Sequence, residues 1–263
     1  MQKSRISVLF GSLRKQGKKA FIPYIMAGDP DTAATLKYVL LLEQCGADII
    51  ELGVPFSDPL ADGPTIQKAA TRAIKSGTTL RKVIALVREI RLHTKIPLIL
   101  MTYYNPVFKY GEDAFIRDAV EAGVDGIIVP DLPPDEAGEI IRLSKHGSAG
   151  KRLDTIFLVA PTSTPARIKK ITSASSGFVY YVSMTGITGA KLALDENIVT
   201  HLNQVKQATD KPVAVGFGIA TPEQARVIAG IADGVIVGSA IVRIFNESPE
   251  KAETFIRGLR EAI

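Results

Sequence analysis

Hydrophobic residues fall in short continuous runs, separated by longer segments in which apolar positions recur at helical spacing. A continuous apolar run without alternation is typical of a parallel strand covered on both faces. Eight runs are predicted strands: 21–26, 48–54, 97–103, 125–130, 155–160, 178–183, 212–216 and 233–237. Eight strand–helix units in a chain of 263 residues predict a (β/α)8 barrel. A doubly wound sheet is the alternative, but it rarely uses eight evenly placed units.

Helix-start and helix-stop signals lie between the predicted strands. Residues suited to the first turn stand where helices should begin, at Asp31, Pro64, Pro134 and Thr221. A glycine shortly before an aspartate ends several helices and supplies a left-handed turn, at Gly46, Gly123 and Gly230. No linker, low-complexity tract or charge block divides the chain, so we expect a single domain spanning residues 1–263.

The N-terminal segment needs its own interpretation. Residues 1–28 contain no Asp or Glu but several Arg, Lys and Ser, a composition shared with organelle transit peptides. However, 21–26 is already a predicted strand, and the preceding apolar residues have helical spacing, at Ile6, Leu9, Phe10 and Leu13. We therefore expect an extra N-terminal helix packed under the barrel, in preference to a targeting signal.

Composition narrows the classes of function. The chain has 32 Lys and Arg against 27 Asp and Glu, a formal charge of +5, which suits an anionic ligand. The basic residues are spread along the predicted helices and Trp is absent, so we expect no nucleic-acid surface. No apolar run approaches the length of a membrane span, and we expect no membrane association. The lone Cys45 excludes an internal disulfide, which makes a reducing, cytoplasmic setting the default.

Two carboxylates stand out where strands end, the part of a barrel that carries function. Glu51 belongs to an apolar predicted strand, and the neighbouring strands contain no lysine to pair with it. We therefore expect Glu51 to transfer protons, with partial burial favouring its protonated form. Asp62 lies on a loop rich in proline and glycine, where proton transfer and a role in the turn before the next helix remain equally open.

Other catalytic groups are missing from these positions. None of the three histidines lies at a predicted strand end, and no cluster of His, Cys and carboxylates has the spacing of a metal site. No predicted strand contains a lysine, which argues against a Schiff-base mechanism. Carboxylates and tyrosines therefore remain for proton transfer, without a metal.

Glycine-rich turns follow the last two predicted strands. Gly216 ends the predicted strand 212–216 and Gly218 follows two residues later, and Gly238 and Ser239 come directly after 233–237. Barrels commonly bind phosphate in these two loops, through backbone N–H groups and a helix N-terminus. Both turns together predict a phosphorylated ligand, and the loop around Gly189 is long enough to act as a lid with a third amide.

Several motifs together resemble the tryptophan synthase α family over essentially the whole chain. They are FIPY with AGDP near the N-terminus, ELGVPFSDPLADGPTIQ at 51–67, and GITGA, GFGI and GSAIV in the second half. The resemblance implies retro-aldol cleavage of indole-3-glycerol phosphate to indole and glyceraldehyde 3-phosphate in tryptophan biosynthesis. It also implies that this chain holds no cofactor and docks on a β subunit with pyridoxal phosphate, as an α2β2 heterotetramer.

The same resemblance implies residue roles. Glu51 looks like the general acid/base, Asp62 like the partner of the indole N–H, and Tyr180 like a tyrosine packed beside the substrate. The implied substrate-binding residues are Tyr24 and Met101 at the indole pocket and Thr188, Gly189, Gly218, Gly238 and Ser239 near the phosphate. Met184 stands where some relatives carry Arg, which argues against lid closure through an ion pair, and Tyr24 replaces a common Phe.

Two other functions are compatible with a phosphate-binding barrel. One is an indole-glycerol-phosphate synthase, a neighbouring step, which would be expected to carry strand-end lysines that this chain lacks. The other is a non-catalytic barrel that regulates a partner subunit. The presence of both Glu51 and Asp62 argues against the second alternative.

Overall fold

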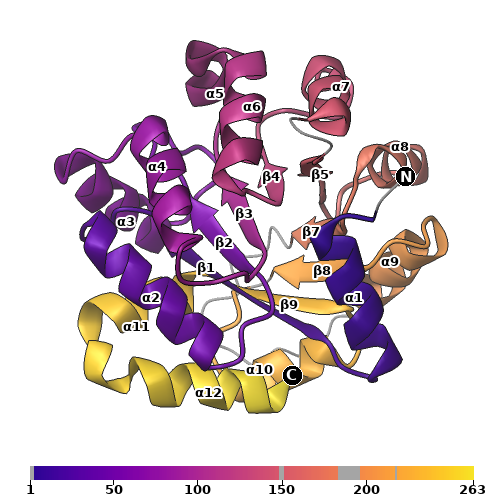
Figure 1. Ribbon diagram of the computed structural model, residues 1–263. Coiled ribbons are helices and arrows are strands. Elements are labelled where there is room, and N and C mark those ends of the chain that lie inside the picture. The colour runs from indigo at the N-terminus through magenta and orange to yellow at the C-terminus, as the bar shows by residue number, and fades with distance from the viewer. Residues whose placement is uncertain (1–2, 148–150, 183–195, 217) are drawn as a thin grey trace.

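The strands form one parallel sheet ringed by helices (Figure 1). The computed structural model describes residues 3–147, 151–182, 196–216 and 218–263. Within them the strand order is β5-β4-β3-β2-β1-β9-β8-β7-β6. The strands are β1 (Ala20–Met26), β2 (Ile50–Gly53), β3 (Leu98–Met101), β4 (Gly126–Ile128), β5 (Asp154–Ile156), β6 (Leu158–Val159), β7 (Val179–Val182), β8 (Val213–Gly216) and β9 (Gly234–Val237).

The sheet closes through one interrupted strand. The predicted strand 155–160 is divided at Phe157 into β5, which pairs with β4, and β6, which pairs with β7. At the break, the carbonyl of Phe157 accepts a hydrogen bond from the backbone N–H of Tyr180 (3.1 Å). β5 and β6 together therefore occupy one of eight positions around a closed barrel, and the (β/α)8 prediction is confirmed.

Helices follow the strands as the sequence predicted, with two differences. Two helices lie between the second and third strands and again between the third and fourth, where the eight strand–helix units imply one each, and the helix expected at Pro134 begins only at Gly138. The described helices are α1 (Arg5–Lys15), α2 (Thr32–Gln44), α3 (Pro64–Lys75), α4 (Leu80–Ile90), α5 (Tyr104–Tyr110), α6 (Glu112–Ala122), α7 (Gly138–His146), α8 (Pro165–Ala174), α9 (Glu196–Gln207), α10 (Pro222–Ala229), α11 (Ser239–Glu247), a 3-10 turn (Pro249–Lys251) and α12 (Ala252–Ala262).

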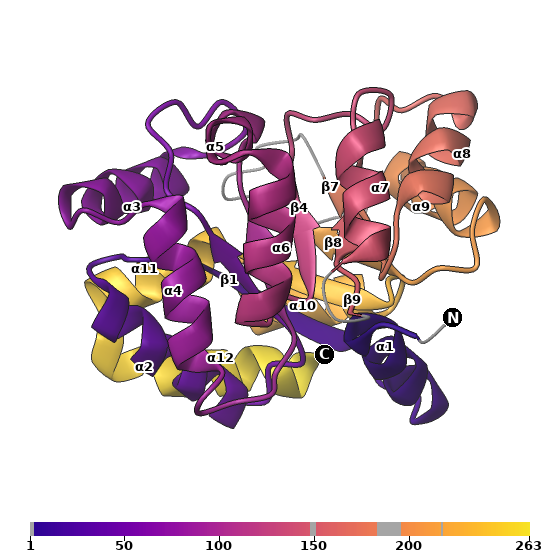
Figure 2. The ribbon, with the colours of Figure 1, turned by 45° about the horizontal axis from the view of Figure 1, so that its top comes forward.

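Alternation along the strands separates the two parts of the core. In β2, Ile50 and Leu52 face the surrounding helices, whereas Glu51 lines the interior of the barrel. The lower interior is apolar and is closed by α1, whose Ile6, Phe10 and Leu13 are buried against the starts of the strands. The Phe10 ring lies 5.6 Å from that of Phe178. The expected N-terminal helix is thus confirmed (Figure 2).

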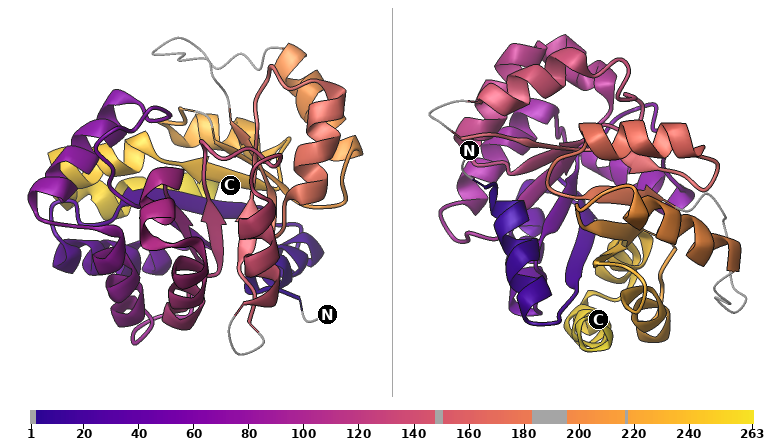
Figure 3. Two further views of the ribbon diagram at one scale, coloured as in Figure 1. Left: turned by 90° about the horizontal axis from the view of Figure 1, so that it is seen from above. Right: turned by 90° about the vertical axis from the view of Figure 1, so that its right-hand side faces the viewer.

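Helices surround the sheet on all sides, and α1 lies across one end of it (Figure 3). In the part of the chain that the structure describes, no helix combines the length and apolar character that crossing a lipid bilayer requires. Cys45, at the end of α2, is buried. The end of the barrel opposite α1 is therefore the open one, where loops and helix N-termini can meet a ligand.

Candidate active site

One cavity of about 640 Å³ opens at the carboxyl ends of the strands. Nine of the residues singled out on the sequence line it together: Tyr24, Glu51, Asp62, Met101, Tyr180, Gly216, Gly218, Gly238 and Ser239. They come from β1, β2, β3, β7 and β8, from the loop before α3, and from the turns after β8 and β9. Two further predicted residues, Thr188 and Gly189, and Met184 on the same loop lie outside the described residues.

Glu51 is a buried carboxyl group facing the cavity. It is the second residue of β2, not its last, and it is aligned with Tyr24 of β1 and Ile99 of β3. Its side chain is 1% exposed, and its Oε1 atom has no hydrogen-bond partner among the described residues. Burial, followed by the charge of Asp62, raises the pKa of Glu51 to about 8. A buried group left unpartnered at a cavity wall is suited to exchange a proton with a ligand.

Asp62 approaches the cavity from the loop before α3, at a position set by Tyr103. The Tyr103 hydroxyl accepts a hydrogen bond from the backbone N–H of Ala61 (2.9 Å) and also bonds to the Asp62 carboxyl group. Burial raises the pKa of Asp62 to about 6, although the bond from Tyr103 acts in the opposite direction. In the structure α3 has Gly63, not Asp62, as its N-cap residue. Asp62 therefore does not cap the helix, and its carboxyl group is available to a ligand.

Two tyrosines project into the barrel beside Glu51, and each lies over a glycine. A β-carbon at Gly53 would coincide with the Tyr24 hydroxyl, and one at Gly216 would lie 2.6 Å from the Tyr180 hydroxyl. Gly216, grouped on the sequence with the phosphate-binding glycines, thus provides space for Tyr180. Burial, with the nearby carboxylates, raises the pKa of both tyrosines well above the usual value. Both remain neutral phenols that can donate a hydrogen bond.

The glycine-rich turns after β8 and β9 form another part of the cavity wall. Gly238 is the N-cap residue of α11, which begins at Ser239, so the free N–H groups of its first turn lie beside the cavity. A β-carbon at Gly218 would meet no atom within 4 Å, which leaves open space in front of this backbone. A helix N-terminus beside an open glycine turn is a suitable place for an anion such as phosphate.

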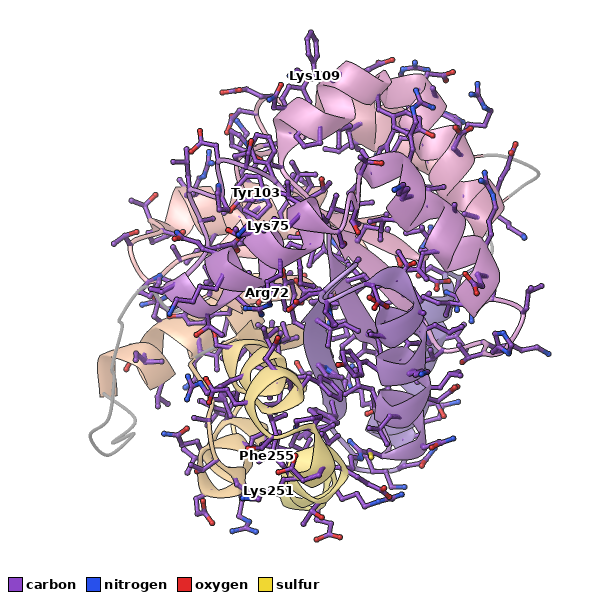
Figure 4. The ribbon with its side chains drawn as sticks, turned by 90° about the vertical axis from the view of Figure 1, so that its left-hand side faces the viewer. Arg72, Lys75, Tyr103, Lys109, Lys251 and Phe255 are labelled. Carbon is purple, nitrogen blue, oxygen red and sulfur yellow. The ribbon has the colours of Figure 1, made fainter. Side chains whose placement is uncertain are left out.

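A buried carboxylate ties together the two helices that flank this cavity. Asp29, 3% exposed, accepts two hydrogen bonds from Arg72 of α3 (2.7 and 2.8 Å) and one from Asn246 of α11 (3.1 Å). Figure 4 shows Arg72 near the contact between α3 and α11. Because Asp62 precedes α3 and Ser239 begins α11, Asp29 fixes the helices of both walls relative to each other.

Three residues around the cavity were missed on the sequence. Tyr103 is the last residue of the predicted strand 97–103, and nothing in its local sequence indicated that it would bond to Asp62. Gly53 lies inside a predicted strand, a position that often marks close approach of another group, and could have been identified in that way. Arg167, on α8, lines the cavity although its sequence context is that of an ordinary solvated helix.

Metal binding has no support among the described side chains. No group of three or more His, Cys, Asp or Glu residues in the described ranges is placed to hold an ion. The polar groups of the cavity are instead two carboxyl groups, two phenols, two serine hydroxyls, one arginine and backbone amides. A closed parallel barrel with two paired carboxyl groups in its mouth defines an acid–base enzyme of the (β/α)8 class.

Comparisons with known proteins identify the family. Residues 10–262 match the family model described as tryptophan synthase alpha chain. The chain is 52% identical over 244 residues to the tryptophan synthase alpha chain of Geotalea uraniireducens, covering 93% of this chain and 90% of the relative. Identity to that of Citrifermentans bemidjiense is 49% over 265 residues, covering 99% and 98%. This protein belongs to the tryptophan synthase alpha chain family.

Solved structures agree with this assignment. A tryptophan synthase structure from Mycobacterium tuberculosis superposes with a TM-score of 0.92 at 42% identity, covering 100% of this chain and 99% of that one. The tryptophan synthase subunit alpha of Legionella pneumophila gives a TM-score of 0.90 at 39% identity, with the same coverage. The barrel and the family resemblance of the sequence motifs are thus both confirmed.

Proposed function

We propose that this protein is a carbon–carbon lyase that cleaves indole-3-glycerol phosphate to indole and glyceraldehyde 3-phosphate in tryptophan biosynthesis. The observation that carries the proposal is that the carboxyl groups of Glu51, buried with an unpartnered Oε1, and of Asp62 line the same cavity. Burial supports their roles, because it raises the pKa of Glu51 to about 8 and that of Asp62 to about 6. Near neutral pH, Glu51 then holds a proton while Asp62 is ionised. One group can donate and the other can stabilise positive charge, as a retro-aldol reaction at an indole requires.

The reaction proceeds in two proton transfers. Glu51 donates its proton to indole C3, and the positive charge that develops at the ring nitrogen is stabilised by the Asp62 carboxylate, which accepts a hydrogen bond from the indole N–H. The ionised Glu51 then removes the proton from the side-chain hydroxyl next to C3. As that hydroxyl becomes the aldehyde, the C3–carbon bond breaks, and its electron pair restores the aromatic indole. Protons and electrons balance without an added reactant.

The remaining cavity residues bind and orient the substrate. Tyr24 and Met101 contact the indole ring, and Tyr180 packs beside the bond that breaks. The phosphate is bound at Gly218, Gly238 and Ser239, where the start of α11 and the open turn after β8 support an anion site. Thr188 and Gly189 extend this site on the basis of the family resemblance.

A β subunit is the proposed partner, in an α2β2 assembly that carries pyridoxal phosphate on the β chain and none on this one. Indole is neutral and apolar, so direct transfer to the partner prevents its loss by diffusion. Phe108, on α5, is 66% exposed and available for docking, whereas Phe56 packs against Tyr103 with ring centroids 5.4 Å apart. Tyr103 also bonds to Asp62. A partner that docks on the loop between β2 and α3, which carries Phe56 and Asp62, can therefore order the catalytic carboxylate of Asp62.

We also propose that the whole chain acts as a single cytoplasmic domain. α1 and α12, at the two ends of the sequence, both have apolar faces buried in the same barrel. The one cysteine, Cys45, is buried, in keeping with a reducing compartment.

The experiment that tests the function is turnover of indole-3-glycerol phosphate, followed by indole release, with and without the β subunit. We expect slow release by the free chain and an increase in kcat of at least about tenfold, or about 1.4 kcal/mol of barrier, with the partner present. A chain that binds the β subunit but releases no indole under either condition would instead be a regulatory barrel. Calorimetry that detects no association would contradict the proposed partnership.

A further inference from the structure

Arg167 is the only cationic side chain among the described residues that line the cavity. The two carboxyl groups in the lining are those of Glu51 and Asp62, and the ionised Asp62 repels an anionic ligand. A phosphorylated substrate carries nearly two negative charges near neutral pH. A positive charge in the cavity wall would attract such a substrate, and Arg167 of α8 provides one.

The position of Arg167 is fixed by the start of α8. Thr164 caps this helix by accepting a hydrogen bond from the Arg167 backbone N–H (3.4 Å), and Pro165 occupies the first turn. The guanidinium Nη1 donates to Oδ2 of Asp135, in the loop after β4, at 2.5 Å. Arg167 is 40% exposed, so its charge faces both the cavity and solvent.

Asp135 is shared between two cations. Its second carboxylate oxygen forms an ion pair with Lys170, one helical turn beyond Arg167. One negative and two positive charges leave a net charge of +1 at this rim. The Nε and Nη2 groups of Arg167 donate no hydrogen bond to any described residue, so they remain available to an approaching anion.

We propose that Arg167 is an anion-attracting residue that draws the phosphate of the substrate into the cavity, where the turns after β8 and β9 then hold it. The inference rests on the proposed function, because it assumes a phosphorylated substrate, and it adds a residue that none of the phosphate-site motifs contains. Attraction of this kind raises the local concentration of the anion and weakens as salt screens the charge.

The test compares Arg167→Gln with the parent enzyme at salt concentrations from about 20 mM to about 500 mM, across which the screening length shortens severalfold. At low salt we expect KM for indole-3-glycerol phosphate to rise about three- to tenfold with kcat little changed, and the difference to disappear at high salt. The matched control is Arg142→Gln, which removes one exposed, ion-paired arginine of α7 that does not line the cavity. This control should keep the KM of the parent at every salt concentration.

Two further variants separate attraction from a structural effect. Arg167→Lys keeps the charge and should recover most of the low-salt KM. Asp135→Asn raises the net charge of the rim by one and should lower KM at low salt, the opposite of the Arg167→Gln effect. Equal KM values for parent and Arg167→Gln at low salt, or a deficit that persists unchanged at high salt, would overturn the proposal.

Binding of glycerol 3-phosphate, measured by calorimetry, keeps this inference distinct from the proposed function. If the parent releases no indole, the proposed function fails, yet the salt-dependent affinity of Arg167→Gln for glycerol 3-phosphate still tests the anion-attracting role. If the parent turns over substrate, and if the parent and Arg167→Gln bind glycerol 3-phosphate equally at low salt, only the role of Arg167 is refuted.

Discussion

The phenol of Tyr180 occupies the space that a side chain at Gly216 would require, with its hydroxyl oxygen and two ring carbons within 3.0 Å of the position of a β-carbon. Gly218, two residues further along the chain, has no such neighbour. The two glycines therefore differ in function: one allows a tyrosine to reach the cavity, and the other leaves room for a ligand. This difference can be tested with small substitutions.

Gly216→Ala should displace Tyr180 and destabilise the barrel by about 1–3 kcal/mol, the usual cost of overpacking. Its kcat should also fall, because Tyr180 lies next to Glu51. Gly218→Ala is the matched control for stability and should melt with the parent. Thermal melting and steady-state kinetics measure both effects. A Gly216→Ala variant with the melting temperature of the parent would show that Tyr180 moves without cost.

Gly218→Val should raise KM at least about tenfold, since a branched side chain would block approach to the backbone amides; that corresponds to about 1.4 kcal/mol of binding. Because nothing lies within 4 Å of the added β-carbon, the fold should be retained. Gly138→Val, at the start of α7, also enters open space, but far from the cavity, and should leave KM unchanged. If glycerol 3-phosphate inhibits the parent and Gly218→Val equally, the phosphate binds at a place other than Gly218.

Glu51→Gln should abolish cleavage, with a loss of about 10²- to 10⁴-fold, the contribution of a general acid–base group. Substrate binding should persist, because the amide has nearly the same shape. A variant that retains more than about a tenth of the parent rate would exclude Glu51 as the proton-transfer group.

The same variant should change how stability depends on pH. The pKa of Glu51 rises from 4.5 to about 8 on folding, so the folded chain holds a proton that the unfolded chain releases. The contribution of Glu51 to stability is complete below pH 4.5 and is lost as pH rises through about 8. Relative to Glu51→Gln, the parent should therefore become less stable across this interval, as melting at several pH values would measure.

The pH profile of kcat/KM should be bell-shaped. Activity requires ionised Asp62 and protonated Glu51, so it should fall below about pH 6 and above about pH 8. Tyr103→Phe removes the hydrogen bond that lowers the pKa of Asp62 and should move the acidic limb to higher pH. The substrate phosphate titrates identically in both enzymes, so this difference reports on Asp62. Asp62→Asn should lose most of its activity. If the acidic limb of the Tyr103→Phe profile lies at the same pH as that of the parent, Asp62 is not the titrating group.

Sequence patterns were sufficient for the barrel because its signals are local. Each buried parallel strand is a continuous apolar run, and several helices have their own start signal, such as Asp31 or Thr221, which cap α2 and α10. The break at Phe157 was not predictable, because it depends on pairing with β4 on one side and β7 on the other. The late start of α7 likewise follows from the loop that holds Asp135, not from the proline before it.

The site was predictable only in part, for a similar reason. Glu51 stood out because a carboxylate in an apolar strand is costly without a partner. The bonds of Tyr103 to the Asp62 loop and of Asp29 to Arg72 join residues about forty positions apart. Such contacts leave no periodic trace in the sequence, and they emerge only when the strand ends are brought together.

The closure of the barrel also constrains the order in which the protein can fold. β1 pairs with β2 on one side and with β9 on the other, so one edge of the first strand stays unpaired until nearly the whole chain has been synthesised. The packing of α1 also cannot be completed until residue 178 has been synthesised, because Phe10 packs on Phe178, just before β7. A nascent or truncated chain that lacks β9 would present an apolar open sheet with two free edges, a form prone to pair with other chains. The last quarter of the sequence therefore protects the first from aggregation.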